Sequence, residues 1–226
     1  MLLSATVKAL RIRTFVAPTF GQNAYVLHRA EGPSALAIDP GAEAAAMAEF
    51  LARERLQLEA VLLTHAHLDH IEGVAELVRA TGAPTYMHPA DQPLYEHVVE
   101  QGLQFGLRVE TQPPVDHALA HGQLLDVAGI ALEVRHVPGH SPGHVIFYCA
   151  AAGAAFVGDT VFQGSIGRSD LPGGDFQQLI GAIRSQLLTL PPDTLLYSGH
   201  GPETSVAHEA KTNPFLIPHY GGGGFA

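Results

Sequence analysis

Four side chains of the types that bind metal ions lie within six residues, at His65, His67, Asp69 and His70. They directly follow the short apolar run 60–63, which predicts a buried β-strand. His65 and His67 stand two residues apart, so in an extended segment both imidazoles project to the same side. A turn after them can bring Asp69 and His70 round to a neighbouring position. The sequence therefore predicts a fold built around a strand end that holds two metal ions side by side.

A pair of ions needs further ligands from other parts of the chain. Three candidates share one setting, the end of an apolar strand followed by Gly, Pro or a turn: His140 after residues 134–137, Asp159 after residues 155–157, and His200 after residues 195–197. Loops at strand ends are where a rigid sheet can hold ligands and still leave room for a substrate.

Composition narrows the classes of function. With 226 residues, 46% of them hydrophobic, the chain can bury a sizeable core and is most simply one domain. Twenty-two acidic residues oppose 12 basic ones, and the net charge of −10 disfavours binding to nucleic acid. The 14 histidines outnumber the lysines and arginines, which again indicates metal.

The lone cysteine, Cys149, excludes an internal disulfide and redox chemistry through paired thiols, and we expect a buried, inert thiol. The amino-terminal segment lacks the pattern of a signal peptide, and no apolar run reaches about 18 residues. We therefore expect a cytoplasmic protein without a membrane partner, either a monomer or a homodimer.

Apolar runs bounded by Gly, Pro and Asp predict strands near residues 7–16, 24–28, 35–38, 60–63, 84–88, 130–137, 144–149, 154–157 and 194–198. Helical spacing predicts helices over 42–55, over 72–80 with Gly82 as C-cap, over 89–102, and from an Asp175 N-cap to about residue 190. This alternation favours packed sheets with helices outside. The tail 221–226 is expected to be flexible.

Taken together, these segments resemble the metallo-β-lactamase fold superfamily, whose five metal-binding motifs occur here in order. The resemblance spans about residues 21 to 216 and includes residues 23–27 and 38–41. It implies an α/β fold, an αββα sandwich with the metals at the edge between two sheets, as a single domain over residues 1–226. It also implies the ligand sets: His65, His67 and His140 for one metal, Asp69, His70 and His200 for the other, and Asp159 as the bridge. Asp39 is expected to orient a ligand imidazole, with a plain turn role as the alternative.

Five neutral imidazoles and two carboxylates bring a charge of −2, so two divalent ions leave the site at +2, enough to hold a hydroxide at neutral pH. We expect a metal-bridging hydroxide to attack an acyl carbonyl, with Asp69 orienting it. A thiolate leaving group suits this site because its departure needs no strong acid. The metals are expected to be zinc, with iron or manganese as alternatives, since histidine and aspartate accept all three.

Residues 164–174 narrow the choice within the superfamily, because they resemble the short bacterial glyoxalase II-like hydrolases, as do residues 197–204 and 213–216. In glyoxalase II a basic residue of this loop contacts the glutathione portion of the thioester, and Arg168 occupies the matching place. A guanidinium can grip a carboxylate through two hydrogen bonds. The alternative is that Arg168 ties down its own glycine-rich loop. Full-length glyoxalase II continues into a helical domain that we expect this chain to lack.

The sequence thus predicts a metal-dependent, hydroxyacylglutathione hydrolase-like enzyme that splits a small-molecule thioester into a 2-hydroxy acid and a thiol. A persulfide dioxygenase with one iron on His65, His140 and Asp159 is the first alternative. A non-catalytic, metal-containing ligand-binding protein is the second. β-Lactamase activity is disfavoured because the position of Asp159 is not cysteine.

Overall fold

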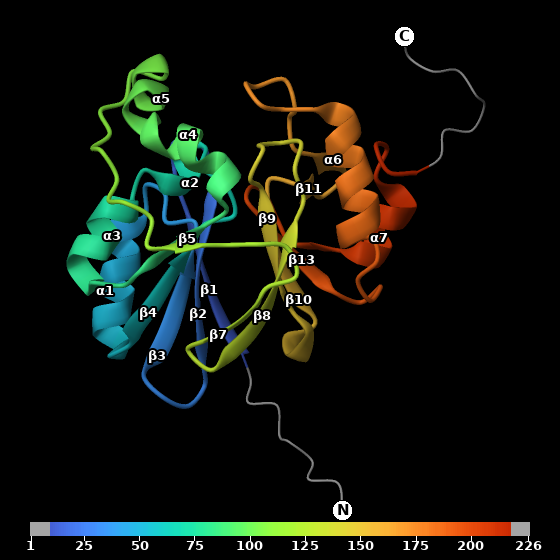
Figure 1. The fold of residues 1–226 in the computed structure, drawn as a ribbon. Coiled ribbons are helices and arrows are strands. Elements are labelled where there is room, and N and C mark those ends of the chain that lie inside the picture. Colours follow the sequence, from blue (N-terminus) through green and yellow to red (C-terminus); the bar gives the residue numbers. More distant parts are fainter. Residues whose placement is uncertain (1–9, 218–226) are drawn as a thin grey trace, which may run out of the picture.

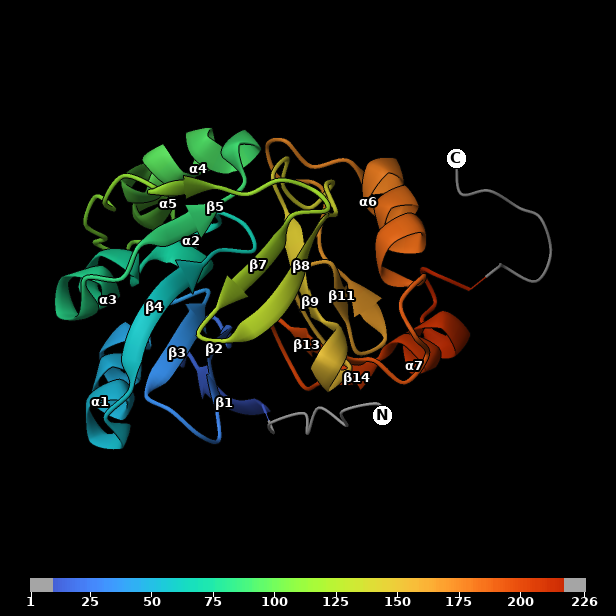
Figure 2. The same ribbon diagram turned by 60° about the horizontal axis from the view of Figure 1, so that its bottom comes forward.

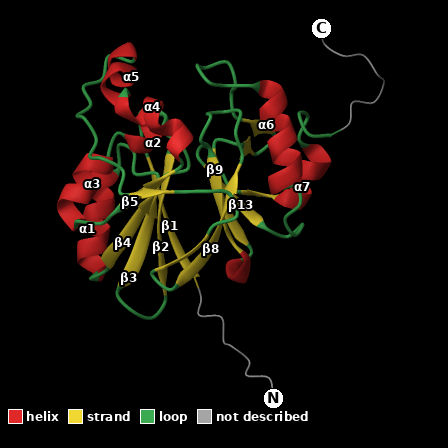
Figure 3. Ribbon diagram, viewed as in Figure 1, coloured by secondary structure: helices red, strands yellow, loops and turns green. Residues whose placement is uncertain are grey.

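Two six-stranded β-sheets lie face to face in the computed structural model, which describes residues 10–217. Helices α1 (Ala44–Glu54) and α3 (Val74–Thr81) cover one outer face, and α6 (Phe176–Ala182) and α7 (Val206–Thr212) cover the other (Figures 1 and 3). A view turned by 60° shows the same order of layers (Figure 2). The fold is therefore the αββα sandwich that the sequence predicted.

The first sheet has the order β1-β2-β3-β4-β5-β6. Strands β1 to β3 pair antiparallel, and β3 to β6 pair parallel. Parallel strands are usually covered on both faces, which explains why β3 and the end of β4 read as continuous apolar runs. The strands are β1 (Leu10–Val16), β2 (Asn23–Arg29), β3 (Ser34–Ile38), β4 (Gln57–Leu62), β5 (Thr85–Met87) and β6 (His117–Ala118).

The second sheet has the order β14-β13-β10-β9-β8-β7, in which only β10 and β13 pair parallel. Its strands are β7 (Leu124–Val127), β8 (Ile130–His136), β9 (Val145–Cys149), β10 (Ala154–Gly158), β13 (Leu195–Ser198) and β14 (Thr204–Ser205). A small hairpin of β11 (Val161–Phe162) and β12 (Ser165–Ile166) follows β10, and a 3-10 turn, η2 (Ala150–Ala152), joins β9 to β10.

Three separate apolar clusters hold the four layers together. Val61 and Met47 belong to the cluster between the first sheet and its helices. Leu36 and Phe147 belong to the cluster between the two sheets, and Leu179 lies in the cluster beneath α6. Each sheet is thus apolar on both faces, which makes the sandwich rigid enough to hold side chains in fixed positions at its edge.

Local signals end the helices where the sequence indicated. Gly82 follows α3 in a left-handed conformation, with φ of 71°. The carboxylate of Asp175 accepts a hydrogen bond from the backbone nitrogen of Gln178 at 2.9 Å and so caps α6. A π-helical turn, η3 (Ile183–Leu187), continues α6 almost to the predicted end near residue 190.

Several elements differ from the prediction. The helix expected over 89–102 is divided into η1 (Pro89–Asp91), α4 (Gln92–Glu96) and α5 (Val98–Gln104). The elements α2 (Leu68–Ile71), α7, β7 and the two-residue strands were not predicted, because elements this short show little periodicity.

Residues 7–9 of the first predicted strand and the tail 221–226 lie outside the described residues. Within residues 10–217, no helix has both the length and the apolar character needed to cross a membrane.

Candidate metal centre

The ends of five strands meet at one edge of the sandwich. Asp39 follows β3, His65 follows β4, His140 follows β8, Asp159 follows β10 and His200 follows β13. The two sheets are joined at this edge by a hydrogen bond of 2.7 Å from the backbone nitrogen of Asn23 to the carbonyl of Gly199. All seven residues predicted as metal ligands come together here, in the arrangement described next.

His65, His67 and His140 form the first group, in which one nitrogen of each ring lies within 4.8 Å of the others. Nε2 of His140 lies 2.8 Å from Nδ1 of His67 and 3.3 Å from Nε2 of His65. Tetrahedral zinc, with bonds of about 2.0–2.1 Å, would place its ligand nitrogens about 3.3 Å apart. The spacing therefore fits a small cation between the three rings.

Asp69, His70 and His200 form the second group. Oδ2 of Asp69 lies 3.2 Å from Nε2 of His200 and 3.9 Å from Nε2 of His70. Asp69 and His70 lie on the short helix α2, where the sequence analysis had expected a turn. A single helical turn serves the same purpose, because it carries both side chains back beside His65.

Asp159 lies between the two groups. Its Oδ1 is 3.3 Å from Nε2 of His70, and its Oδ2 is 3.5 Å from Nε2 of His140 and 3.6 Å from Nε2 of His200. Gly199 makes this approach feasible, because a Cβ at that position would collide with the Asp159 carboxylate and lie 2.7 Å from the His70 ring. The structure therefore places a carboxylate where it can contact a metal in either group.

Four of the five imidazoles are held from behind through Nδ1. Backbone carbonyls accept these bonds from two rings, and the Asp39 carboxylate accepts the bond from a third. The fourth ring bonds to the Thr64 hydroxyl, which itself donates to Asp39. The four bonds are His65 to Thr64 Oγ1 at 3.0 Å, His70 to Asp39 Oδ2 at 3.0 Å, His140 to the carbonyl of Arg168 at 2.7 Å, and His200 to the carbonyl of Phe20 at 3.2 Å. Because Nδ1 carries the proton, each Nε2 directs a lone pair toward the centre.

The residues present fit a pair of metal ions. Within residues 10–217, Nε2 of His70 and Oδ1 of Asp159 are buried with no hydrogen-bond partner. His65, His67 and His140 turn ring nitrogens toward one another, with 2.8 Å between His67 and His140 and 3.3 Å between His65 and His140. Both features would be unfavourable in a packed core, since buried polar atoms are normally paired, and a cation at each group satisfies them.

Burial and neighbouring groups keep His65, His67 and Asp159 in the forms that bind metal. Burial and the neighbouring rings lower the pKa of His65 far below its ordinary value, and burial, together with His140, lowers the pKa of His67 to about 3. Burial alone would raise the pKa of Asp159, but His70 and the other imidazoles lower it instead. Burial would lower the pKa of His70, but Asp159 and Asp69 raise it, so this ring favours a proton when no cation is bound, and a metal ion would take the place of that proton.

Asp39 supports the site from behind. Its Oδ1 accepts a hydrogen bond from the backbone nitrogen of Thr64 at 2.7 Å, and its Oδ2 accepts bonds from Thr64 Oγ1 at 2.6 Å and from Nδ1 of His70 at 3.0 Å. Asp39 also lies within 4.8 Å of His65 and His70, but these hydrogen bonds occupy both of its oxygens. It adopts a left-handed conformation with φ of 50°, which Asp tolerates better than most residues.

Two further side chains that the sequence analysis did not single out fasten the ligand loops. The carboxylate of Asp91, fully buried, accepts hydrogen bonds from Ala66, Ser141 and Gly143. Gln101 of α5 accepts a hydrogen bond from the backbone nitrogen of Leu68 at 3.0 Å. Asp91 stands three residues after the predicted strand 84–88, the same spacing as His140 after residues 134–137, so that setting was the available signal. Gln101 lies within a helix and has no such signal.

His144 contacts two of the proposed ligands directly. Its Nε2 accepts a hydrogen bond of 3.0 Å from the backbone nitrogen of Asp159, and its ring stacks on that of His65 with centroids 4.7 Å apart. Its spacing of four residues from His140 is the signal in the sequence that could indicate this position.

Arg168 reaches the mouth of the site but is paired with a neighbour. Its Nε and Nη2 donate to the two carboxylate oxygens of Asp170 at 2.7 and 2.8 Å. Both side chains are largely exposed, at 60% and 70%. Arg168 thus binds within its own loop and also lines the cavity at the ligands, while its contact with a substrate stays a prediction.

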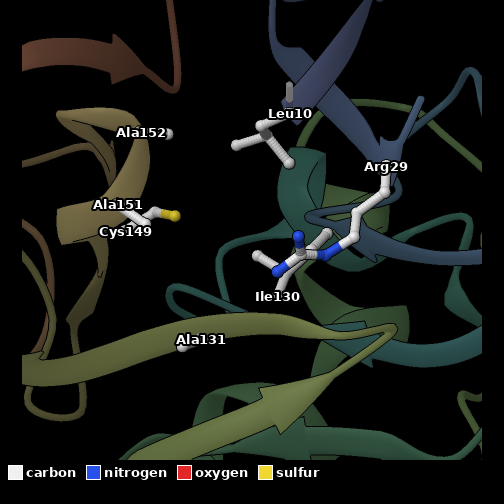
Figure 4. Close-up of a pocket in the computed structure, with 7 residues that line it drawn as sticks. All are labelled: Leu10, Arg29, Ile130, Ala131, Cys149, Ala151 and Ala152. Atoms are coloured by element: carbon white, nitrogen blue, oxygen red, sulfur yellow. The ribbon is translucent and has the colours of Figure 1, made fainter. Parts of the chain in front are cut away.

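That cavity has a volume of about 230 Å³ and is bordered by Asp69, His140, Asp159, Arg168 and His200. A smaller cavity of about 60 Å³ contains none of the predicted ligands (Figure 4). There, the sulfur of Cys149 faces an apolar space beside Leu10 and Ile130. Cys149 is buried in β9, as the sequence predicted.

Comparison with known proteins agrees with this architecture. A family model described as the metallo-beta-lactamase superfamily matches residues 17–200. The chain is 36% identical over 209 residues to the hydroxyacylglutathione hydrolase GloC of Haemophilus influenzae, covering 92% of this chain and 98% of GloC.

Two solved structures are similar over nearly the whole chain. The BLEG-1 B3 metallo-beta-lactamase has a TM-score of 0.86 and 37% identity, covering 93% of this chain and all of BLEG-1. TTHA1623 in a di-iron-bound form has a TM-score of 0.83 and 42% identity, covering 90% of this chain and all of TTHA1623.

Proposed function

This chain belongs to the metallo-beta-lactamase superfamily, and from that premise we propose that it is a metal-dependent hydrolase of thioesters. The products would be a 2-hydroxy acid and a free thiol. The geometry of the site carries the metal-dependent part of the proposal, because four imidazoles are fixed with Nε2 facing inward around Asp159. The similarity to GloC supports the thioester as substrate.

We propose that His65, His67 and His140 hold one ion, that Asp69, His70 and His200 hold the other, and that Asp159 contacts both. The short distances within each group and the unpartnered atoms of His70 and Asp159 support this assignment. Zinc is our proposed metal. Iron and manganese are alternatives, and the di-iron form of the related TTHA1623 supports iron as the first of them.

When bound, the ions supply a hydroxide at neutral pH and polarise the thioester carbonyl. Asp69 is placed to orient the nucleophile, because Oδ2 faces His200 and the carboxylate borders the cavity. Burial would raise the pKa of Asp69, but His70 and His200 lower it, so the side chain is ionised and accepts hydrogen bonds.

In the reaction, water loses one proton, its oxygen bonds to the acyl carbon, and the carbon–sulfur bond breaks. The sulfur leaves with the bonding electrons as a thiolate, which needs no strong general acid and takes up a proton from solvent to give the free thiol.

Arg168 is our candidate for contact with the thiol portion of the substrate. A guanidinium has five N–H donors, and Asp170 occupies only those on Nε and one on Nη2. The remaining donors are free to bind a carbonyl oxygen of a substrate in the cavity that Arg168 lines. We further propose that residues 1–226 form a single domain and that the protein works in the cytoplasm.

Metal analysis by mass spectrometry, combined with a panel of substrates on the same sample, tests the proposal. We expect about two ions per chain and hydrolysis of S-lactoylglutathione in preference to esters, lactones and β-lactams. One iron per chain with oxygen uptake on glutathione persulfide would instead establish a dioxygenase. A fully metallated protein that hydrolyses none of these substrates would favour a non-catalytic binding protein.

The variant Asp159→Ala tests whether this carboxylate joins the two groups. It should lose metal and activity together, since both groups would lose a shared neighbour. The exposed Asp193→Ala is the matched control, expected to keep both. Retention of two ions by Asp159→Ala would show that Asp159 does not bridge them.

A further inference from the structure

A second cavity adjoins the one at the metal ligands. It has a volume of about 270 Å³ and lies against α4 and α5. The two cavities share His67, Gln101, Phe105 and Leu171 in their walls, so they form one continuous cleft. A 2-hydroxyacyl group is small enough to stay beside the metal ligands. The longer thiol portion of a thioester is therefore the part that must extend into the second cavity.

The wall of the second cavity is largely apolar and carries little charge. Leu94, Phe105, Leu171 and Pro172 provide its apolar surface. Glu100 is the one Asp, Glu, Lys or Arg among the described residues that line it. Among residues 10–217, the lining includes no Lys or Arg, and its other titratable groups are His97 and the proposed metal ligand His67. Away from His67, a carboxylate would meet the negative charge of Glu100, whereas an uncharged chain with methylene and amide groups would meet a compatible wall.

Asp170 removes the positive charge that the mouth of the cleft would otherwise present. The nearest guanidinium, that of Arg168, is bound through two nitrogens to the Asp170 carboxylate. Such an exposed pair adds little to folding stability, but it leaves the loop without net charge. A substrate carboxylate can still reach the remaining N–H donors of Arg168, but it then meets the negative charge of Asp170 beside them.

We propose that this cleft selects thioesters whose thiol portion carries no net negative charge, with Asp170 as a specificity-determining residue. The inference rests on the proposed thioester hydrolysis and names the class of carrier that the hydrolase would use. A pantetheine-like arm, uncharged and rich in amides, represents that class. Glutathione, with two carboxylates and one ammonium group, represents the class that the cleft disfavours.

The proposed selectivity is tested by measuring kcat/KM of the metallated enzyme at low ionic strength on two thioesters with the same acyl group, S-lactoylpantetheine and S-lactoylglutathione. We expect wild type to show the higher kcat/KM on the pantetheine thioester. Asp170→Asn should raise kcat/KM on the glutathione thioester about threefold relative to kcat/KM on the pantetheine thioester, because it removes the negative charge beside Arg168. A wild-type preference for glutathione, or an unchanged ratio in Asp170→Asn, would overturn the proposal.

Glu110→Gln is the matched control, since Glu110 pairs with Arg79 at 2.6 Å in an equally exposed ion pair that does not line the cleft. Glu110→Gln should leave the ratio of kcat/KM on the glutathione thioester to kcat/KM on the pantetheine thioester as in wild type. Glu100→Gln should also raise kcat/KM on the glutathione thioester relative to the pantetheine thioester, because it removes the negative charge from the cavity wall.

Binding of thioethers, which cannot be hydrolysed, separates this inference from the proposed function. Calorimetry should show that S-alkyl pantetheine binds wild type more tightly than S-alkyl glutathione, and that Asp170→Asn narrows the difference. This result would support the selectivity of the cleft even if no thioester were hydrolysed. Tighter binding of the glutathione thioether by wild type would refute the selectivity while leaving thioester hydrolysis intact.

Discussion

Oδ2 of Asp91 accepts a hydrogen bond from Oγ of Ser141 at 2.7 Å, across 50 residues of sequence. The same oxygen accepts a bond from the backbone nitrogen of Ala66 at 3.0 Å, and Oδ1 accepts one from the nitrogen of Gly143 at 2.5 Å. One buried carboxylate thus joins the loop of His65 and His67 to the loop of His140. A Cβ at Gly143 would lie 2.8 Å from Oδ1, so glycine is needed for this contact.

Asp91→Asn should weaken both the fold and the first metal group. The amide can accept in place of only one oxygen, so at least one buried donor loses its acceptor, and the free energy of unfolding should fall by about 1–3 kcal/mol. Urea unfolding measures this loss, and metal analysis of the folded variant should show less metal than in wild type. The exposed Asp126→Asn serves as control. Full metal content in a destabilised Asp91→Asn would limit the role of Asp91 to folding.

Asp39→Asn should lower metal affinity while preserving the backbone, because Asn tolerates the left-handed conformation at this position. His70 would lose the carboxylate that fixes its ring, and such changes typically reduce metal affinity about 10–100-fold. Titration with zinc against a competing chelator measures the affinity. An affinity equal to that of wild type would favour the plain turn role for Asp39.

Leu36→Ala should be strongly destabilising, because Leu36 is fully buried between the two sheets. The cavity left behind should reduce the free energy of unfolding by about 2–5 kcal/mol. Leu124→Ala is the matched control: Leu124 is 80% exposed, and its replacement should change stability by less than about 0.5 kcal/mol. Urea unfolding of both variants checks the prediction, and similar losses would contradict the layered core.

His88→Asn should make stability less sensitive to acid. Burial, together with His136, lowers the pKa of His88, and the two rings stack with centroids 4.3 Å apart. The unfolded chain therefore binds this proton more readily, so stability falls as the pH drops below about 6.5. Asn removes the titration and can still accept the hydrogen bond that His88 takes from the nitrogen of Ala90.

Urea unfolding of wild type and His88→Asn at about pH 7.5 and about pH 5.5 compares the two. The variant should lose less stability between these values than wild type. An equal or larger loss in the variant would show that His88 does not contribute to acid sensitivity.

Much of the fold could be predicted from the sequence, because the longer strands carry apolar runs and the helices carry caps. Asp175 and Gly82 delimit helices where their chemistry indicates. The division of residues 89–102 into three helical pieces could not be predicted. Two residues of these pieces, Asp91 and Gln101, form hydrogen bonds with ligand loops that are distant in sequence, and local spacing carries no sign of such contacts.

The metal centre, too, could be predicted only in part from the sequence. The sequence alone determined which residues carry metal-binding atoms and that they follow strand ends, since residue type and apolar spacing are local properties. Only the tertiary structure decided which ring nitrogen faces the centre, that Asp91 joins two loops, and that Arg168 is paired with Asp170. The physical reason is that hydrogen bonds depend on distances in space, and packing the two sheets brings together atoms as far apart in sequence as His65 and His140.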